Sequence, residues 1–224
     1  MYKDNNKTDL NMIKCPLCKS VDIYEFYFDK ERKYLQCGVC NLVFVSEIYF
    51  LSKQEEKKRY DLHQNNSEDQ NYRKFLNRIF LPMKEKLLLG SFGLDFGSGP
   101  GPTLSVMFQE IGHKVDLYDY FYAQDSSVFQ KEYDFITATE VLEHLHHPQK
   151  ELDRLWACLK QDGTLGIMTK LVLNKDAFAF WHYKNDPTHV CFFSKTTFYW
   201  LADKWQAEVS FIDNDVIIFY KSKK

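Results

Sequence analysis

Residues 92–101, Phe-Gly-Leu-Asp-Phe-Gly-Ser-Gly-Pro-Gly, predict a short apolar strand that runs directly into a glycine-rich loop. Residues 103–111 then have the spacing of an amphipathic helix, which we expect to end at Gly112. A strand, a glycine loop and a helix in this order form the nucleotide-binding turn of a doubly wound sheet. Glycine is needed there because the backbone must turn sharply and approach a ligand without Cβ atoms in the way.

An acidic residue after the next predicted strand narrows the choice of ligand. The strand at 114–118 ends at Asp119, about twenty residues past the loop, where a carboxylate can accept both hydroxyls of a ribose. An NAD site would place an acid at the same point. However, the loop has the spacing Gly-x-Gly-x-Gly instead of the dinucleotide fingerprint, and it lacks the Gly-Lys-Ser/Thr ending of a P-loop. Asp95, at the end of the first strand, suits a cofactor with a cationic amino-acid portion better than a pyrophosphate.

Three stretches carry a resemblance to a known family. Residues 94–101 resemble motif I of class I S-adenosylmethionine-dependent methyltransferases, and Asp119 matches their ribose-binding acid. Residues 133–144, Tyr-Asp-Phe-Ile-Thr-Ala-Thr-Glu-Val-Leu-Glu-His, are similar to the fourth-strand motif of the branch that includes the quinone-biosynthesis methyltransferases. Residues 159–165 resemble the turn before their fifth strand.

The resemblance implies an α/β fold: a Rossmann-like, seven-stranded sheet with a reversed last strand and helices on both faces. Predicted strands at 208–212 and 216–220 fit the final hairpin of that sheet. Only residues 120–132 separate the second strand from the fourth, which is less than most relatives use for a helix and a third strand. Because the adenine pocket is normally lined from this region, Asp125 and Ser126 are its candidates here.

The resemblance also implies roles for individual residues. The glycine loop would contact the methionine end of S-adenosylmethionine, Asp119 the ribose, and residues 139–141 the wall beside the sulfonium. The expected cofactor-binding residues are Asp95, Gly97, Ser98, Gly99, Gly101, Asp119, Tyr120, Thr139, Glu140 and Val141. Aromatic rings favour a sulfonium cation, and Tyr60, Tyr72 and Tyr118 are candidates for such rings, with packing as the alternative role.

Histidines are the candidates for proton transfer, because a base is needed when the methyl acceptor is a hydroxyl. The expected catalytic residues are His144, His182 and His189. His189 ends a Pro-Thr-His stretch that resembles the substrate side of the same methyltransferase branch. The alternative is that these histidines cap loops and hold the backbone. A metal site made by the histidines is a further alternative, although the sequence shows no carboxylate at a convincing spacing for it.

Four of the six cysteines form two Cys-x-x-Cys pairs with eighteen residues between them. These residues are Cys15, Cys18, Cys37 and Cys40. The spacer has the β-branched and aromatic composition of strands, so the pattern resembles a zinc ribbon in which one tetrahedral Zn²⁺ is held structurally. A pair of redox dithiols is the alternative.

Length and composition set the remaining expectations. The chain has 224 residues, which is enough for one α/β domain and a small appendage. We expect a zinc ribbon at 1–48, a linker with helices at 49–90 and the S-adenosylmethionine-binding domain at 91–224. Within 49–90, residues 53–59 form a charge-rich part of the linker, and residues 72–80 and 83–89 are expected as helices interrupted by Pro82. Residues 1–11 are polar and no apolar run could span a bilayer, so the chain is expected to be cytoplasmic.

Two classes of function compete at this stage. The first is a methyltransferase that acts on a small-molecule acceptor, with the zinc ribbon packed beside the active site. The second is an RNA or protein methyltransferase whose ribbon binds the macromolecule. Residues 1–45 mix lysines and acids nearly evenly, and the net charge is −2, so the electrostatic pattern expected for phosphate contacts is weak. The oligomeric state is left open, as is a non-catalytic binding protein that keeps the fold.

Overall fold

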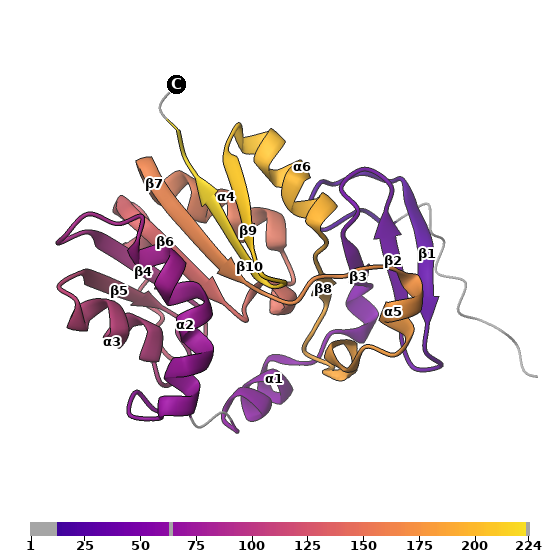
Figure 1. Ribbon diagram of the computed structural model, residues 1–224. Helices are drawn as coiled ribbons and strands as arrows, with labels where there is room; N and C mark the ends of the chain where they lie inside the picture. Colours follow the sequence, from indigo (N-terminus) through magenta and orange to yellow (C-terminus); the bar gives the residue numbers. More distant parts are fainter. Residues whose placement is uncertain (1–12, 63–64, 223–224) are drawn as a thin grey trace, which may run out of the picture.

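Two β-sheets organise the chain in the computed structural model, which describes residues 13–62 and 65–222 (Figure 1). The strands are β1 (Ile23–Phe28), β2 (Lys33–Cys37), β3 (Val43–Val45), β4 (Phe92–Phe96), β5 (Lys114–Tyr118), β6 (Tyr133–Thr139), β7 (Leu159–Met168), β8 (Cys191–Phe192), β9 (Glu208–Ile212) and β10 (Val216–Tyr220). The helices are α1 (Lys53–Tyr60), α2 (Gln70–Lys84), α3 (Thr103–Glu110), α4 (Pro148–Cys158), α5 (Lys175–Ala179) and α6 (Lys195–Trp205). Short 3₁₀ turns lie at η2 (Glu47–Tyr49), η3 (Ser126–Gln130), η4 (Leu142–His144) and η5 (His182–Asn185).

The smaller sheet has the order β1-β2-β3-β8. Its first three strands form the antiparallel meander that the cysteine spacer predicted. The fourth strand comes from far along the chain, because Val43 pairs with Phe192 and Phe44 pairs with Cys191. Residues of the segment 91–224 therefore complete the N-terminal sheet. The predicted absence of a signal peptide in residues 1–11 lies outside the described residues.

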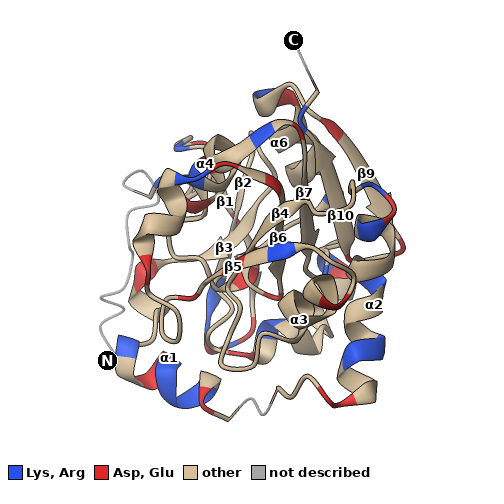
Figure 2. Cartoon of the chain, turned by 90° about the vertical axis from the view of Figure 1, so that its left-hand side faces the viewer, with Lys and Arg blue, Asp and Glu red and all other residues tan. Residues whose placement is uncertain are grey.

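The connection between the two sheets contains two helices. Residues 53–59, expected as a charge-rich linker, form α1, which starts at a capping box between Ser52 and Glu55 and displays charges of both signs (Figure 2). The segments expected as two helices around Pro82 form the single helix α2, and residues 85–89 are not helical. Pro82 is tolerated because it stands in the last turn, where it removes one intrahelical hydrogen bond instead of splitting the helix. In the described part of the chain, no helix is long and apolar enough to cross a membrane.

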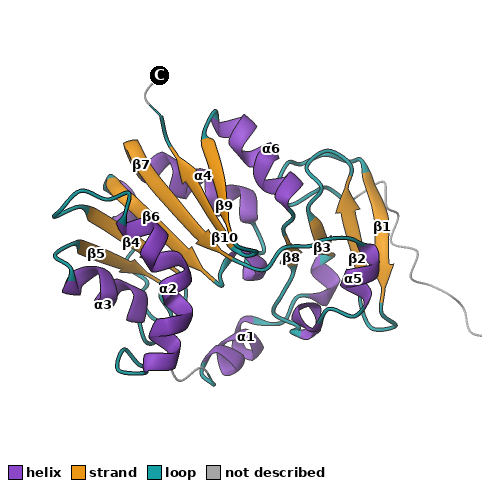
Figure 3. Ribbon diagram, in the orientation of Figure 1, coloured by secondary structure: helices purple, strands orange, loops and turns teal. Residues whose placement is uncertain are grey.

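The larger sheet has the order β5-β4-β6-β7-β10-β9 (Figure 3). Strands β5, β4, β6 and β7 are parallel, and β10 lies antiparallel between β7 and β9, as the resemblance implied for the reversed last strand. The sheet has six strands in the described residues, whereas seven were expected. The missing strand is the third, because residues 120–132 contain only an isolated bridge, Asp119 with Ala123, and the turn η3. Thirteen residues are too few for a helix and a strand that returns parallel to its neighbour.

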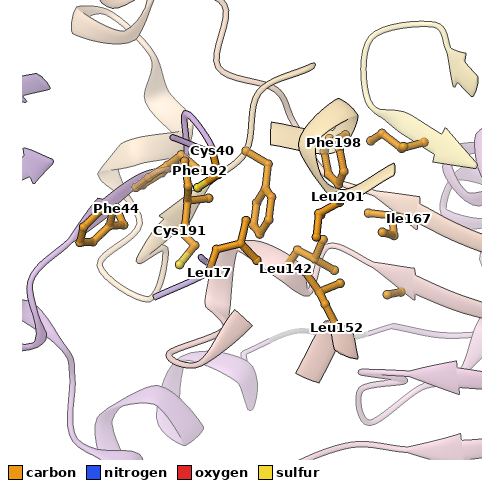
Figure 4. Packing of buried hydrophobic residues seen from close by; sticks show 14 of the residues in the cluster. Leu17, Cys40, Phe44, Leu142, Leu152, Ile167, Cys191, Phe192, Phe198 and Leu201 are labelled. Carbon is orange, nitrogen blue, oxygen red and sulfur yellow. The ribbon is translucent and has the colours of Figure 1, made fainter. Parts of the chain in front are cut away.

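Two layers of helices cover the larger sheet. Helices α2 and α3 pack on one face, where Phe135 of β6 meets Met83 and Phe108 in a shared core cluster. On the other face, the next residue of β6, Ile136, belongs to a cluster with α4 and α6 because side chains alternate along a strand. This second cluster extends into the cysteine-bearing sheet: Figure 4 shows Leu17 and Leu142 close together between the two parts. The hydrophobic core is thus continuous from the N-terminal sheet to the larger sheet.

Candidate active site

A pocket opens at the carboxyl ends of β4, β5 and β6 and has a volume of about 890 Å³. This volume is typical of the larger small-molecule sites. Its lining comes from the glycine loop at 97–101, the end of β5 at 118–122 and the segment after β6 at 139–147. Helix α1 and the segment after η5 contribute further residues, among them Glu56 and His189.

The glycine loop has the backbone that its sequence predicts. Gly97 and Gly99 have φ angles of +76° and +64°, in the region where other residues are strained. The Gly97 amide donates to the carbonyl oxygen of Tyr118 at 2.7 Å, which fixes the loop against β5. A Cβ atom on Gly97 would lie 2.2 Å from Val141, so glycine is also required there for space.

Asp119 bridges the glycine loop and the end of β5. One carboxylate oxygen, Oδ2, accepts the Gly99 amide at 3.0 Å. The other, Oδ1, accepts the amides of Phe121 at 2.7 Å and Tyr122 at 3.0 Å. A carboxylate offers about four lone-pair sites, so the protein uses three of them and leaves about one for a ligand in the pocket.

Asp95 also lines the pocket, but its two oxygens are already used by the protein. Ser105 of α3 donates to Oδ2 and Thr137 of β6 donates to Oδ1, both at 2.8 Å. Burial raises the pKa of Asp95 above its ordinary value, while the two hydroxyl donors lower it. Asp95 therefore ties the loop to the neighbouring helix and strand, which is a positioning role in addition to the ligand contact expected from the sequence.

Two residues of the pocket lining, Ser98 and Thr139, have buried hydroxyls without hydrogen-bond partners in the described residues. A buried hydroxyl without a partner costs free energy unless a ligand or water supplies one. Glu140, the residue after Thr139, has a positive φ of +52°, and its amide donates to the carbonyl oxygen of Met168 at 2.7 Å. All ten expected cofactor-binding residues, from Asp95 to Val141, line the same pocket.

Aromatic side chains form the wall on the Asp119 side. Tyr118, Tyr120, Phe121 and Tyr122 line the pocket there, and the Lys53 Nζ of α1 lies 4.4 Å from the ring centre of Tyr120. Asp125 and Ser126, the expected adenine-pocket residues, are not in the lining; Asp125 instead caps η3 by accepting the Ser127 amide at 2.9 Å. Flat rings close to Asp119 are therefore the better candidates for stacking on a purine.

The end of the pocket that is lined by the segment after β6 contains two carboxyl groups, Glu140 and Glu143. Glu143 is buried and accepts hydrogen bonds from Tyr183 Oη and, at 2.9 Å, from Thr169 Oγ1. Burial raises the pKa of both carboxyls, and the charge of Glu143 raises the pKa of Glu140 further. No role was predicted for Glu143, although it stands directly before His144 in the turn η4 that follows the parallel strand β6.

His144 and His189 lie together at this end, with ring centres 4.7 Å apart. His189 Nδ1 lies 2.6 Å from the carbonyl oxygen of Tyr183, and His144 Nδ1 lies 3.3 Å from that of Thr188. A carbonyl only accepts, so each Nδ1 carries the proton and Nε2 is the basic atom of each ring. Burial and the neighbouring His144 lower the pKa of His189 to about 3, which keeps its imidazole neutral. His182 is outside the lining, where its Nε2 lies 3.1 Å from Lys170 Nζ, so the structure does not bring it to the pocket.

Glu143, His144 and His189 can also hold a metal ion. One ligand atom from each of the three lies within 4.8 Å of the others, and two of the three residues are buried. Histidine ligands of metals usually donate their second ring N–H to a backbone carbonyl or carboxylate, as both rings do here. The sequence shows no carboxylate at a convincing spacing for a histidine metal site, and Glu143 is the carboxylate that the structure places beside the two histidines.

The four cysteines of the N-terminal sheet converge as their spacing predicts. Their Sγ atoms lie within 4.8 Å of one another, with Cys15 and Cys40 at 3.5 Å and Cys18 and Cys37 at 3.4 Å. Zn–S bonds of about 2.3 Å in a tetrahedron require sulfur atoms about 3.8 Å apart. The two turns also have the same backbone: in each, the amide of the fourth residue after the first cysteine (Lys19 or Asn41) donates to that cysteine's carbonyl at 3.0 Å. The site fits a structural Zn²⁺.

Comparisons with known proteins agree with this geometry. A family model described as "Methyltransferase domain" matches residues 63–210, which is well over half of the chain. In sequence, no curated protein matches the chain.

Two solved structures share the fold. The chain is similar to a Burkholderia thailandensis 1,6-didemethyltoxoflavin-N1-methyltransferase, solved with 1,6-didemethyltoxoflavin and S-adenosylhomocysteine bound, at a TM-score of 0.53 and 15% identity. That match covers 89% of this chain and 99% of the other. A SAM-dependent methyltransferase from Archaeoglobus fulgidus matches at a TM-score of 0.50 and 16% identity, covering 68% of this chain and 95% of that one.

Proposed function

The chain belongs to the methyltransferase domain family, and from this premise we propose that it transfers the methyl group of S-adenosylmethionine to a small-molecule acceptor bound in the same pocket. The observation that carries the proposal is the cradle made by the glycine loop and Asp119. One cavity is lined by two glycines with positive φ, by a carboxylate with one remaining acceptor site and by two residues with unpartnered buried hydroxyls. These groups fit the polar atoms of a nucleoside linked to an amino acid.

The pocket residues divide the work between the two reactants. S-adenosylmethionine, when bound, supplies an electrophilic methyl group on a sulfonium. The loop and Asp119 orient the nucleoside, and Tyr60 and Tyr72, which line the pocket as expected, offer ring faces to a cation. Methyl transfer is an in-line displacement, so the chain contributes mainly by fixing the geometry and excluding water.

Helix α1 helps to exclude water. Its buried residue Glu56 lies 2.8 Å from His146 Nε2, and the Phe50 ring stacks on His146 with ring centres 4.1 Å apart. These contacts hold α1 over the pocket mouth. Glu56 and His146 were not expected to act together, since they are 90 residues apart in the sequence.

The acceptor is proposed to bind against Glu143, His144 and His189, beyond the wall formed by residues 139–141. The neutral imidazole of His189, whose pKa of about 3 makes it a weak base, can accept a hydrogen bond at Nε2 from an acceptor hydroxyl or amine and so orient it for transfer. The same three residues could instead hold a divalent ion that lowers the pKa of an acceptor hydroxyl. A metal titration separates the two roles: if turnover of chelator-treated enzyme that keeps its cysteine-bound zinc responds to added Mg²⁺ or Mn²⁺, the ion is required.

A small acceptor is favoured over a macromolecule for two reasons. The pocket has room for two ligands of the size of those bound in the Burkholderia thailandensis enzyme. The described residues 13–52, which include β1 to β3, carry five lysines or arginines and five acids, so this part of the chain lacks the excess of cations expected for RNA. We propose that Cys15, Cys18, Cys37 and Cys40 bind one structural Zn²⁺, because a four-cysteine site leaves no open position for a substrate.

The experiment that tests this function uses a methyl donor labelled with deuterium in the methyl group and an extract of small metabolites. We expect the label in a low-molecular-weight product, found by mass spectrometry, with wild-type protein, and much less of it with the Asp119→Asn variant when the methyl donor is kept below the variant's dissociation constant. Label that appears only in added RNA or protein would instead support the macromolecular alternative. No transfer to any fraction would contradict both.

A further inference from the structure

A buried arginine next to β2 of the N-terminal sheet lies behind a segment that lines the pocket. Arg32 lies just before β2, its exposed fraction is 9%, and it is not in the pocket lining. Its guanidinium crosses to the segment 184–189, more than 150 residues further along the chain. That segment carries two lining residues, Asp186 and His189.

The guanidinium satisfies three backbone carbonyls of this segment. Nη1 donates to the carbonyl oxygen of His189 at 3.1 Å, and Nη2 donates to those of Lys184 and, at 3.3 Å, Asp186. Its Nε donates to Tyr34 Oη at 3.2 Å, which holds the fork in its plane. Arginine can reach three carbonyls at once because its N–H groups are spread over a planar fork. Lysine cannot do so here, because its three N–H groups all belong to one nitrogen atom.

The negative charge of Asp29 offsets part of the free-energy cost of burying the Arg32 and Lys184 cations. Asp29, at the start of the same hairpin, accepts the Tyr34 hydroxyl at 2.8 Å and lies 3.6 Å from the Nζ of the buried Lys184. The Asp29 carboxylate also accepts the backbone amide of Arg32 at 2.8 Å. Two cations, one acid and three carbonyls therefore join the hairpin to the segment 184–189 in a closed network.

The other side of the segment faces the pocket. His189 Nδ1 donates to the Tyr183 carbonyl, and Asp186 Oδ1 accepts both the amide and, at 2.7 Å, the hydroxyl of Thr188. The segment is therefore held on its backbone side by Arg32 and contributes the side chains of Asp186 and His189 to the pocket lining.

We propose that Arg32 is a positioning residue for methyl transfer: it sets the place of His189 by holding the carbonyls of residues 184–189 against the cysteine-bearing sheet. This rests on the proposed function, because it assumes that His189 acts on the acceptor. The cysteine-bearing sheet then contributes to catalysis without contacting the substrate. A misplacement of about 1 Å in such a group can lower turnover roughly 100-fold.

The test compares Arg32→Lys and Arg32→Met with Lys33→Met, which removes an exposed cation from the neighbouring position. We expect both Arg32 variants to lose at least about tenfold in kcat, while zinc content and the dissociation constant of S-adenosylhomocysteine stay at the wild-type values. The Lys33→Met variant should match wild type. Wild-type kcat in Arg32→Lys would overturn the proposal, as would loss of zinc or of S-adenosylhomocysteine binding in both Arg32 variants.

A double-mutant cycle distinguishes positioning from general damage. If Arg32 acts through His189, Arg32→Lys should have little further effect on the residual transfer rate of His189→Ala, so the two losses are not additive. Additive losses would contradict the proposal. Amide hydrogen exchange of residues 182–190 provides a readout independent of turnover: it should become faster in both Arg32 variants and stay at the wild-type rate in Lys33→Met. Unchanged exchange in the Arg32 variants would also contradict the proposed role of Arg32. If the wild-type protein binds no S-adenosylhomocysteine, the proposed function is refuted, but the exchange result still tests whether Arg32 holds the segment.

Discussion

Replacement of Asp119 by asparagine is the substitution with the best-defined consequence. Asparagine can keep the contacts of Oδ1 with the amides of Phe121 and Tyr122, but it places an NH₂ group where Oδ2 accepts the Gly99 amide. Two donors then face each other, and the acceptor site left for the ribose disappears as well. The substitution therefore removes one internal hydrogen bond and one hydrogen bond to the ligand.

The size of the effect follows from the charge of the acceptor. A hydrogen bond to a charged group contributes about 1.5–3 kcal/mol, which corresponds to roughly a 10- to 100-fold change in dissociation constant. We expect Asp119→Asn to weaken S-adenosylhomocysteine binding by this factor in isothermal titration calorimetry. Asp125→Asn is the control, because Asp125 is an exposed carboxylate outside the lining. A change of less than about threefold in Asp119→Asn, with the fold intact, would refute the assignment of Asp119 to the ribose.

Three further substitutions or treatments test other parts of the account. Gly97→Ala should lower the melting temperature and abolish S-adenosylhomocysteine binding, because its Cβ would lie 2.2 Å from Val141 at a φ of +76°. Wild-type affinity in this variant would show that the loop can accommodate a Cβ atom. Removal of metal with a chelator should release about one Zn²⁺ per chain, measured by atomic absorption, and melt the cysteine-bearing sheet while S-adenosylhomocysteine still binds; protein purified without chelator that holds no zinc would contradict the site. His189→Ala should lower transfer of labelled methyl groups at least about 100-fold with unchanged S-adenosylhomocysteine affinity, and unchanged turnover would remove His189 from the catalytic residues.

Local patterns were sufficient to predict a large part of the fold. The strand and loop at 92–101, the cysteine pairs and the final hairpin have the predicted bounds within a few residues. Each is specified by neighbours in the sequence: glycines at positive φ, short ligand spacing, or alternating apolar residues around a turn. The cofactor side of the site was predictable for the same reason, because it is built from the carboxyl ends of adjacent parallel strands.

Two features of the backbone differ from the expectation because their local signal is weak or absent. Helix α1 has no apolar face to mark it, and its sequence signature is the capping box Ser52-x-x-Glu55. The third strand of the expected sheet is missing because residues 120–132 are too few to form it, so the aromatic residues after Asp119 line the pocket directly.

The acceptor end of the pocket depends on contacts that a sequence cannot show. Arg32 and His189 are 157 residues apart, and Glu56 meets His146 across 90 residues. The strand β8 joins the N-terminal sheet although it lies near the other end of the chain. His144 and His189 meet where the Val190 amide donates to the carbonyl oxygen of Glu143 at 2.8 Å, whereas His182, close to His189 in sequence, points to Lys170 outside the pocket.

The central claim, that the glycine loop and Asp119 hold S-adenosylmethionine, is tested most directly by calorimetric titration of the intact wild-type protein with S-adenosylhomocysteine at two temperatures. Two temperatures are needed because the enthalpy of binding can pass through zero at one of them. The account predicts saturable binding with a stoichiometry of about one ligand per chain. No heat at either temperature, with the protein folded, would contradict it.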